Sequence, residues 1–131
     1  YAEDCIVIGA DTVVACDQEI LGKPADDQDA FRMLHMLQGR THEVYTGVAI
    51  LSYNNAGEKE IINHAVETKV HVHEMSEEEI RAYIATGDPM DKAGAYGIQG
   101  SFAAYIDGIE GDYYNVVGLP VSYVYQCLKK Y

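Results

Sequence analysis

An aspartate directly after an apolar run is the clearest candidate for chemistry in this chain. The run Cys5–Ala10 is rich in β-branched residues and ends at Asp11. This pattern favours a buried, central strand with a carboxylate at its end. A sheet holds such a carboxylate rigidly, which suits metal binding or the activation of a water molecule. The alternative is an aspartate that only caps a turn through its own backbone.

Lysines in two short loops can supply positive charge. Lys23 lies between a glycine and a proline, so its ammonium group can meet a phosphate as a fixed charge. Lys92 belongs to the run 91–100, which also contains the amide of Gln99 and three glycines. Glycine weakens helices and strands but lets the backbone pass close to a ligand. The alternative for both lysines is a solvated side chain, in the second case on a plain glycine-rich turn.

Two histidines form a weaker candidate. His71 and His73 lie two residues apart in a predicted strand, so they share a face and can bind zinc. Exposed strand histidines without a third ligand nearby are the alternative. The chain has no GxSxG, Walker A, HExxH or dinucleotide-binding motif, which argues against serine-hydrolase, P-loop, zincin and Rossmann enzymes.

The elements that must position these groups alternate between strands and helices. The first strand is expected to continue through 13–16, turn at 17–18 and return through 19–21. Helical spacing of apolar residues predicts a helix over Asp26–Leu37, capped by its first residue and stopped by Gly39.

The middle of the chain predicts a long β-hairpin. Polar and apolar residues alternate over His42–Tyr53 and again over Ile61–His73, and the turn residues 54–57 join the two runs. A capping box at Ser76–Glu79 then opens a helix that extends through Ile84.

The C-terminal part predicts smaller elements. A short strand is expected over Ala103–Ile106, a turn over Gly108–Asp112, and a final helix beginning at Pro120. The order β-β-α-β-β-α-loop-β-α indicates a mixed α/β (α+β) fold with antiparallel pairing in its middle.

Composition narrows the class of protein. The 131 residues are 48% hydrophobic, which suits one domain over 1–131. The net charge of −12 argues against binding to nucleic acid polymers or anionic membranes. No apolar run is long enough to span a bilayer and no signal peptide is visible, so we expect a cytoplasmic protein. The scattered Cys5, Cys16 and Cys127 suit reduced thiols.

Five short motifs point to one family when they are taken together. They occur in order at 9–13, 21–24, 39–47, 91–100 and 111–120. The series resembles the Maf family of nucleoside triphosphate pyrophosphatases, also called septum formation inhibitor proteins. The residues at 98–100 and 111–115 are similar to those of the branch that acts on dTTP and UTP, and they differ from those of the 7-methyl-GTP branch.

The resemblance implies a Maf/inosine-triphosphatase-like fold, with a central mixed sheet flanked by helices. It also implies hydrolysis of a pyrimidine nucleoside triphosphate to the monophosphate and pyrophosphate, with a divalent cation, Mg²⁺ or Mn²⁺. Asp11 would match the proton acceptor and lie on or near the metal, and Lys23 would contact phosphate. Thr12 and Gln99 would match positions that shape base selection, and Lys92 lies in the matching substrate loop.

Family members also carry a strand and a Ser-x-Ser-Pro-Arg-Arg phosphate loop before the motif that contains Asp11. The present sequence holds no such loop, so we expect it to represent the C-terminal two-thirds of the family fold. The resemblance then predicts weak or no hydrolysis by these 131 residues alone. It also predicts an exposed sheet edge that can support a homodimer. A regulatory binding protein that acts in cell division without catalysis is the alternative function.

Overall fold

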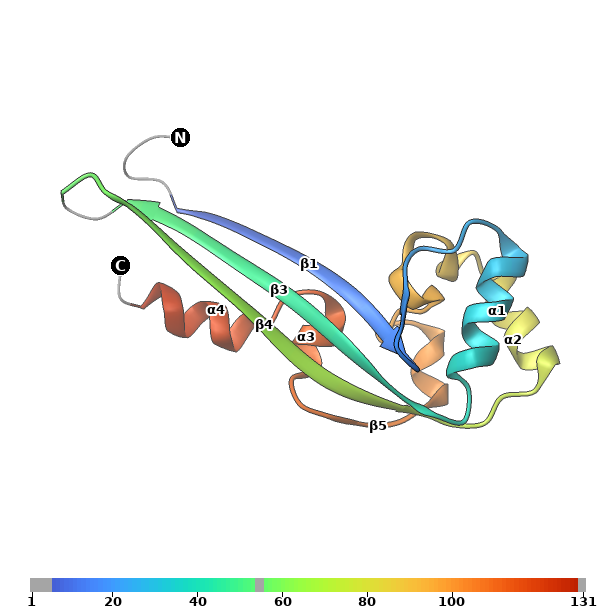
Figure 1. Cartoon of the computed structure of the whole chain (residues 1–131). Coiled ribbons are helices and arrows are strands. Elements are labelled where there is room, and N and C mark those ends of the chain that lie inside the picture. Colours follow the sequence, from blue (N-terminus) through green and yellow to red (C-terminus); the bar gives the residue numbers. More distant parts are fainter. Residues whose placement is uncertain (1–5, 54–55, 130–131) are drawn as a thin grey trace.

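The computed structural model describes residues 6–53 and 56–129, which form one five-stranded sheet and its helices (Figure 1). The strand order is β2-β1-β3-β4-β5. The strands are β1 (Val7–Cys16), β2 (Glu19–Leu21), β3 (Thr41–Tyr53), β4 (Lys59–Val72) and β5 (Ile106–Glu110). The mixed α/β class expected from the sequence is confirmed.

Every neighbouring pair in this sheet is antiparallel, where a mixed sheet was expected. The reason lies in the turn after β1. Asp17 and Gln18 both have positive φ, at 50° and 66°, and this turn sends β2 back along β1. The helix α1 (Asp27–Leu37) connects β2 to β3, which lies on the other side of β1. Since β2 and β3 run in the same direction, β1 is antiparallel to both.

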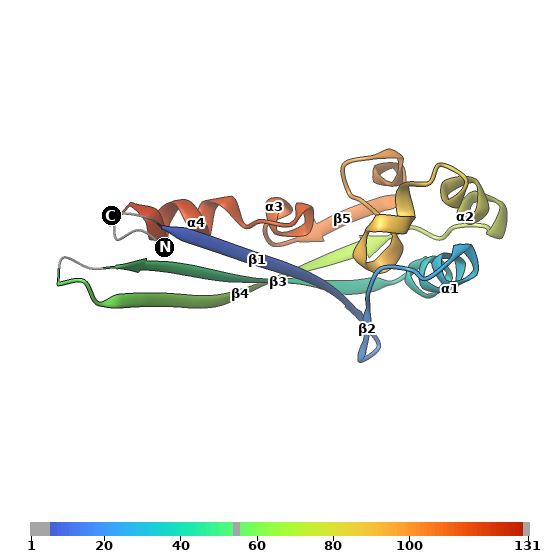
Figure 2. The same cartoon turned by 90° about the horizontal axis from the view of Figure 1, so that it is seen from above.

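The long β3–β4 hairpin was predicted correctly, and its alternation decides where the core lies. Along β3, the side chains from His42 to Ser52 at every second position are buried, and those between them are more exposed. The buried face packs against α1 and α2 (Glu77–Ile84) at one end of the sheet. Near the other end it packs against α4 (Val121–Leu128). Figure 2 shows α3 (Tyr113–Val117) and α4 on one side of the strands.

The N-terminal half of β1 is not the buried, central strand that its composition suggested. Ile6 and Ile8 are each 41% exposed. Because β2 pairs only with Val14–Cys16, the edge of β1 before Val14 has no strand partner among the described residues. An apolar run predicts burial only when the rest of the fold supplies a covering layer, which cannot be seen in the run itself. Cys5, part of the predicted strand, lies outside the described residues, as do Asn54 and Asn55 of the predicted turn.

The two helix starts with polar caps were predicted correctly. The Asp26 side chain accepts a hydrogen bond from the backbone N–H of Asp29 at the start of α1. Ser76 and Glu79 exchange side-chain and backbone hydrogen bonds at the start of α2. Gly39, with φ 66°, follows the end of α1 and turns the chain into β3.

The C-terminal third differs more from expectation. The predicted strand at 103–106 is mostly the 3₁₀ helix Ser101–Tyr105, and the predicted turn at 108–112 is largely strand β5. The five-residue helix α3 was not predicted. These segments are short, so local propensity does not decide their form; β5 pairs with β4, and Asn115 of α3 donates a hydrogen bond to the Val66 carbonyl of β4. Among the described helices, none combines the length and apolar character that crossing a bilayer requires.

Candidate functional site

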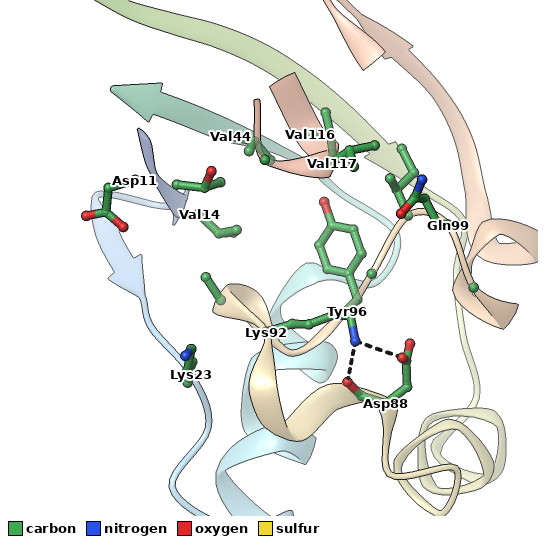
Figure 3. Close-up of a pocket in the computed structure, with 16 residues that line it drawn as sticks. Asp11, Val14, Lys23, Val44, Asp88, Lys92, Tyr96, Gln99, Val116 and Val117 are labelled. Atoms are coloured by element: carbon green, nitrogen blue, oxygen red, sulfur yellow. Dashed lines mark hydrogen bonds and ion pairs between the residues drawn. The ribbon is translucent and has the colours of Figure 1, made fainter. Parts of the chain in front are cut away.

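A cavity of about 580 Å³ opens where β1, the loop after β2, the segment 88–100 and α3 meet. Its lining includes all five residues that the sequence singled out for catalysis or substrate binding, shown in part in Figure 3: Asp11, Thr12, Lys23, Lys92 and Gln99. They come from segments that are distant in sequence, and the sheet and its loops bring them to one place. Their roles remain predictions.

Asp11 occupies one margin of this pocket. It lies on β1 opposite Gly47 of β3, and its carboxylate points away from the apolar side chains in Figure 3. The side chain is exposed and makes no hydrogen bond or ion pair with the described residues. The neighbour opposite is a glycine, so nothing on β3 covers the carboxylate. Asp11 is therefore free to bind a cation or to accept a proton.

Lys23 lies on the same side of the pocket as Asp11 (Figure 3). Its loop is fixed at Pro24, which is buried, and at Gly22, whose carbonyl accepts a hydrogen bond from the backbone N–H of Gly94 at 3.1 Å. The Lys23 ammonium is exposed and pairs with no carboxylate of the described chain. Lys23 can therefore meet an incoming anion without first breaking an ion pair.

Lys92 differs from Lys23 because its ammonium is already bound. Nζ donates to Asp88 Oδ1 at 2.8 Å, to the Asp88 carbonyl at 3.1 Å and to Asp91 Oδ1 at 3.1 Å. A lysine ammonium has three protons, so these three oxygens use its donor capacity. The hydrogen bond to Asp88 raises the pKa of Lys92, and the same bond holds the pKa of the Asp88 carboxyl below its usual range. In this arrangement Lys92 shapes the loop, and Asp88 and Asp91 offset its charge.

A buried tyrosine completes this network and was missed by the sequence reasoning. Tyr83 of α2 donates from its hydroxyl to Asp88 Oδ2 at 2.5 Å and accepts from the Gly97 N–H at 3.2 Å. Burial and the Asp88 carboxylate raise the pKa of Tyr83, so the hydroxyl stays protonated. A Cβ on Gly97 would lie 2.6 Å from Lys92 Cε, so a side chain there would displace the lysine from this network. The four-residue spacing of Asp88 and Lys92 could have indicated from the sequence that these two side chains pair.

Thr12 points to the opposite face of β1 from Asp11 and joins a buried polar chain. Its Oγ1 lies 2.9 Å from Thr46 Oγ1 on β3, and Thr46 Oγ1 donates to the Asn115 carbonyl at 3.0 Å. The Asn115 side chain is fully buried and donates to the Val66 carbonyl and to Thr68 Oγ1, at 2.9 and 3.0 Å. This series of hydrogen bonds holds α3, and with it one wall of the pocket, against the sheet.

The rest of the pocket is largely apolar. Val44 of β3, Val116 and Val117 of α3 and the ring of Tyr96 lie between the Asp11 margin and Gln99 in Figure 3. Flat apolar groups such as nucleobases bind in surroundings of this kind. Gln99, exposed at the far side, supplies an amide that can both donate and accept. The pocket thus has a charged end and an apolar end.

A buried histidine that does not itself line the pocket contacts Tyr96, and the structure keeps this histidine neutral. His42 is fully buried and its Nε2 lies 2.7 Å from the Tyr96 hydroxyl oxygen. Burial lowers the pKa of His42 to about 4, and His71 adds a smaller effect in the same direction. Neutral His42 can exchange one hydrogen bond with Tyr96 and so fix the ring that lines the pocket.

This histidine predicts a loss of stability in mild acid. The unfolded chain binds a proton at His42 near pH 6.5 and the folded chain only near pH 4. Between these values the unfolded state holds more protons, so the free energy of unfolding falls as the pH falls. The difference corresponds to about 2 kcal/mol between pH 7 and pH 5. Urea denaturation of the wild-type chain and of His42→Gln at pH 7 and pH 5 measures this change in the free energy of unfolding. An equal change in the two proteins would mean that His42 is not its cause.

The two histidines considered as zinc ligands do not form a metal site. Nε2 of His71 lies 3.6 Å from Glu110 Oε2, and Nε2 of His73 lies 3.5 Å from Asp107 Oδ1. Across residues 6–53 and 56–129, no group of three or more histidine, cysteine, aspartate or glutamate side chains could hold a metal ion. His71 lies on β4 and His73 just after it, and neither lines the pocket.

Comparison with known proteins identifies the family. The sequence model of the Maf family, described as Maf-like protein, matches residues 1–131. Relatives named dTTP/UTP pyrophosphatase include one from Agathobacter rectalis, 57% identical over 128 residues, which are 98% of this chain and 62% of that protein. Those from Koribacter versatilis and Lachnoclostridium phytofermentans are 56% and 50% identical, over 99% and 100% of this chain and 64% and 66% of their own lengths. The chain thus spans just under two thirds of these relatives, and it belongs to the Maf family.

Proposed function

We propose that this chain is part of an enzyme that hydrolyses dTTP and UTP to the nucleoside monophosphate and pyrophosphate. The observation that carries the proposal is the division of the pocket, with Asp11 and Lys23 at one end and an apolar wall with Gln99 at the other. A nucleotide has the same division between phosphates and base. The relatives named dTTP/UTP pyrophosphatase support this choice of substrate.

In the proposed reaction a water molecule attacks the α-phosphorus. The oxygen–phosphorus bond to water forms as the bond between the α-phosphorus and the bridging oxygen breaks, and pyrophosphate leaves. Asp11 accepts the proton of the attacking water, because its carboxylate is exposed at the pocket margin and without a partner in the described chain. Lys23 contacts the phosphates and offsets part of their charge. The base lies against Val44 and Tyr96.

A divalent cation, Mg²⁺ or Mn²⁺, fits the donor set of the pocket. Asp88 and Lys92 neutralise each other, and Asp11 and Lys23 carry opposite charges, so these four groups leave the triphosphate charge unbalanced. Mg²⁺ binds through one or two carboxylates together with substrate phosphates and water. Asp11 is the carboxylate that can hold it here. When bound, the cation would supply positive charge at the phosphates and orient them.

Two further expectations belong to the same proposal. The protein acts in the cytoplasm, where nucleoside triphosphates are found. It can also form a homodimer, for which the edge of β1 over Val7–Val13, which pairs with no strand of the described residues, offers backbone hydrogen-bonding groups.

The identity of the products tests the function even at a low rate. Purified chain is incubated with dTTP or UTP and Mg²⁺, and the products are separated by anion-exchange chromatography. We expect monophosphate and pyrophosphate in equal amounts. Diphosphate with inorganic phosphate would place the attack at the γ-phosphorus and contradict the proposal. ATP serves as the control nucleotide, with slower turnover expected because the similar proteins are named for dTTP and UTP.

A further inference from the structure

The fully buried Thr46 lies beneath the pocket without lining it. Its hydroxyl contacts two oxygen atoms, the Asn115 carbonyl at 3.0 Å and Thr12 Oγ1 at 2.9 Å. A carbonyl can only accept, and a hydroxyl has a single proton to donate. Asn115 is itself fully buried, so leaving its carbonyl without a donor would be costly. The proton of Thr46 therefore goes to Asn115.

This assignment fixes the direction of the next hydrogen bond. Since the Thr46 proton is used, the bond between the two threonines must be donated by Thr12. The Thr12 oxygen then has no proton left for a ligand and presents only lone pairs to the pocket. Thr12 Oγ1 lies 3.9 Å from the point that a Cβ on Gly118 would occupy. It is thus placed beside the end of α3, whose Val116 and Val117 line the same apolar end of the pocket as Val44 and Tyr96, where the base lies in the proposed function.

We infer that Thr46 is a specificity-determining residue, which makes Thr12 a hydrogen-bond acceptor and so selects a base with a ring imide N–H. Thymine and uracil carry a proton on N3, whereas N3 of cytosine is an acceptor. An acceptor facing an acceptor loses a hydrogen bond and leaves both atoms desolvated. The inference rests on the proposed function. It adds that Thr12 Oγ1 is the atom by which the pocket distinguishes uridine from cytidine nucleotides.

Binding of two non-hydrolysable analogues tests the inference. The α,β-imido analogues of UTP and CTP are titrated into the 131-residue chain with Mg²⁺, by calorimetry, and the ratio of their Kd values is compared among variants. The wild type is expected to favour the UTP analogue. Thr46→Val removes the acceptor for the Thr12 proton and frees that hydroxyl to donate to cytosine N3. The ratio should therefore narrow by roughly 10-fold or more, as the loss of one mispaired hydrogen bond implies.

Two control variants separate specificity from packing. Thr46→Ser keeps the hydroxyl and should keep the wild-type ratio. Thr68→Val removes an equally buried hydroxyl that donates to the Asp112 carbonyl at 3.0 Å and also helps to hold α3. Thr68 does not contact Thr12, so this variant should lose stability in thermal unfolding but keep the ratio.

The outcomes are distinct. A wild-type ratio near one, an unchanged ratio in Thr46→Val, or an equal narrowing in Thr68→Val would overturn the inference. Failure of the wild type to bind either analogue would instead overturn the proposed function, and the inference with it.

Discussion

Replacing Asp11 with asparagine is expected to slow the release of pyrophosphate from dTTP by roughly 10²- to 10⁴-fold, the usual contribution of a general base. Asparagine has the size of aspartate but cannot accept the proton of the attacking water, and it is a weaker ligand for Mg²⁺. The side chain is exposed and makes no hydrogen bond within the described residues, so the fold should not depend on its charge. The rate of pyrophosphate release and the melting temperature are measured on the same preparations.

A matched control is available on another element. Glu78→Gln removes one exposed carboxylate from the first turn of α2, outside the pocket, and should leave the rate within a factor of two or so, as a surface change does. Comparable losses in both variants would mean that net charge, and not the position of Asp11, controls turnover. A normal rate in Asp11→Asn would remove Asp11 from the catalytic role.

Local patterns in the sequence were enough to predict the elements that hold the pocket. Asp26 and the Ser76–Glu79 box act through hydrogen bonds within four residues, so they do not depend on the rest of the fold. The β3–β4 hairpin was equally readable because its long alternation admits only one face for the core. Asp11, Lys23, Lys92 and Gln99 were singled out from their types and neighbours, the resemblance added Thr12, and the structure brings all five together.

The remaining features depend on partners distant in sequence. The apolar start of β1 was expected to be buried, yet Ile8 is 41% exposed because no described element covers that part of the strand. The hydrogen bond from the Lys92 ammonium to Asp88 was not predicted, and the substrate-binding role of Lys92 stays a prediction. Nothing in the sequence indicated a role for Thr46, since threonine is common in alternating strands. Its role depends on Asn115, 69 residues away.

Gly94→Ala should produce the largest loss of stability among single methyl additions to the pocket loop. Gly94 has φ 73°, where an L-residue costs about 1–2 kcal/mol. An added Cβ would also lie 2.9 Å from both methyl groups of Val14. Val14 is buried in β1 and paired with strands on both sides, so it cannot move away. Overpacking of this kind adds about 1–3 kcal/mol. Urea denaturation should therefore show a loss of about 2–5 kcal/mol.

Gly57→Ala separates the two causes. Gly57 has nearly the same φ, 79°, but no atom of the described residues lies within 4 Å of the added Cβ, so Gly57→Ala should lose only the 1–2 kcal/mol or so of backbone strain. Equal losses in the two variants would contradict the contact with Val14. The position of Gly94 gives a second readout, because its N–H donates to the Gly22 carbonyl beside Lys23. A shift of Gly94 away from Val14 displaces both loops of the charged end. Gly94→Ala should therefore weaken nucleotide binding under conditions where the chain remains folded, whereas Gly57→Ala should not.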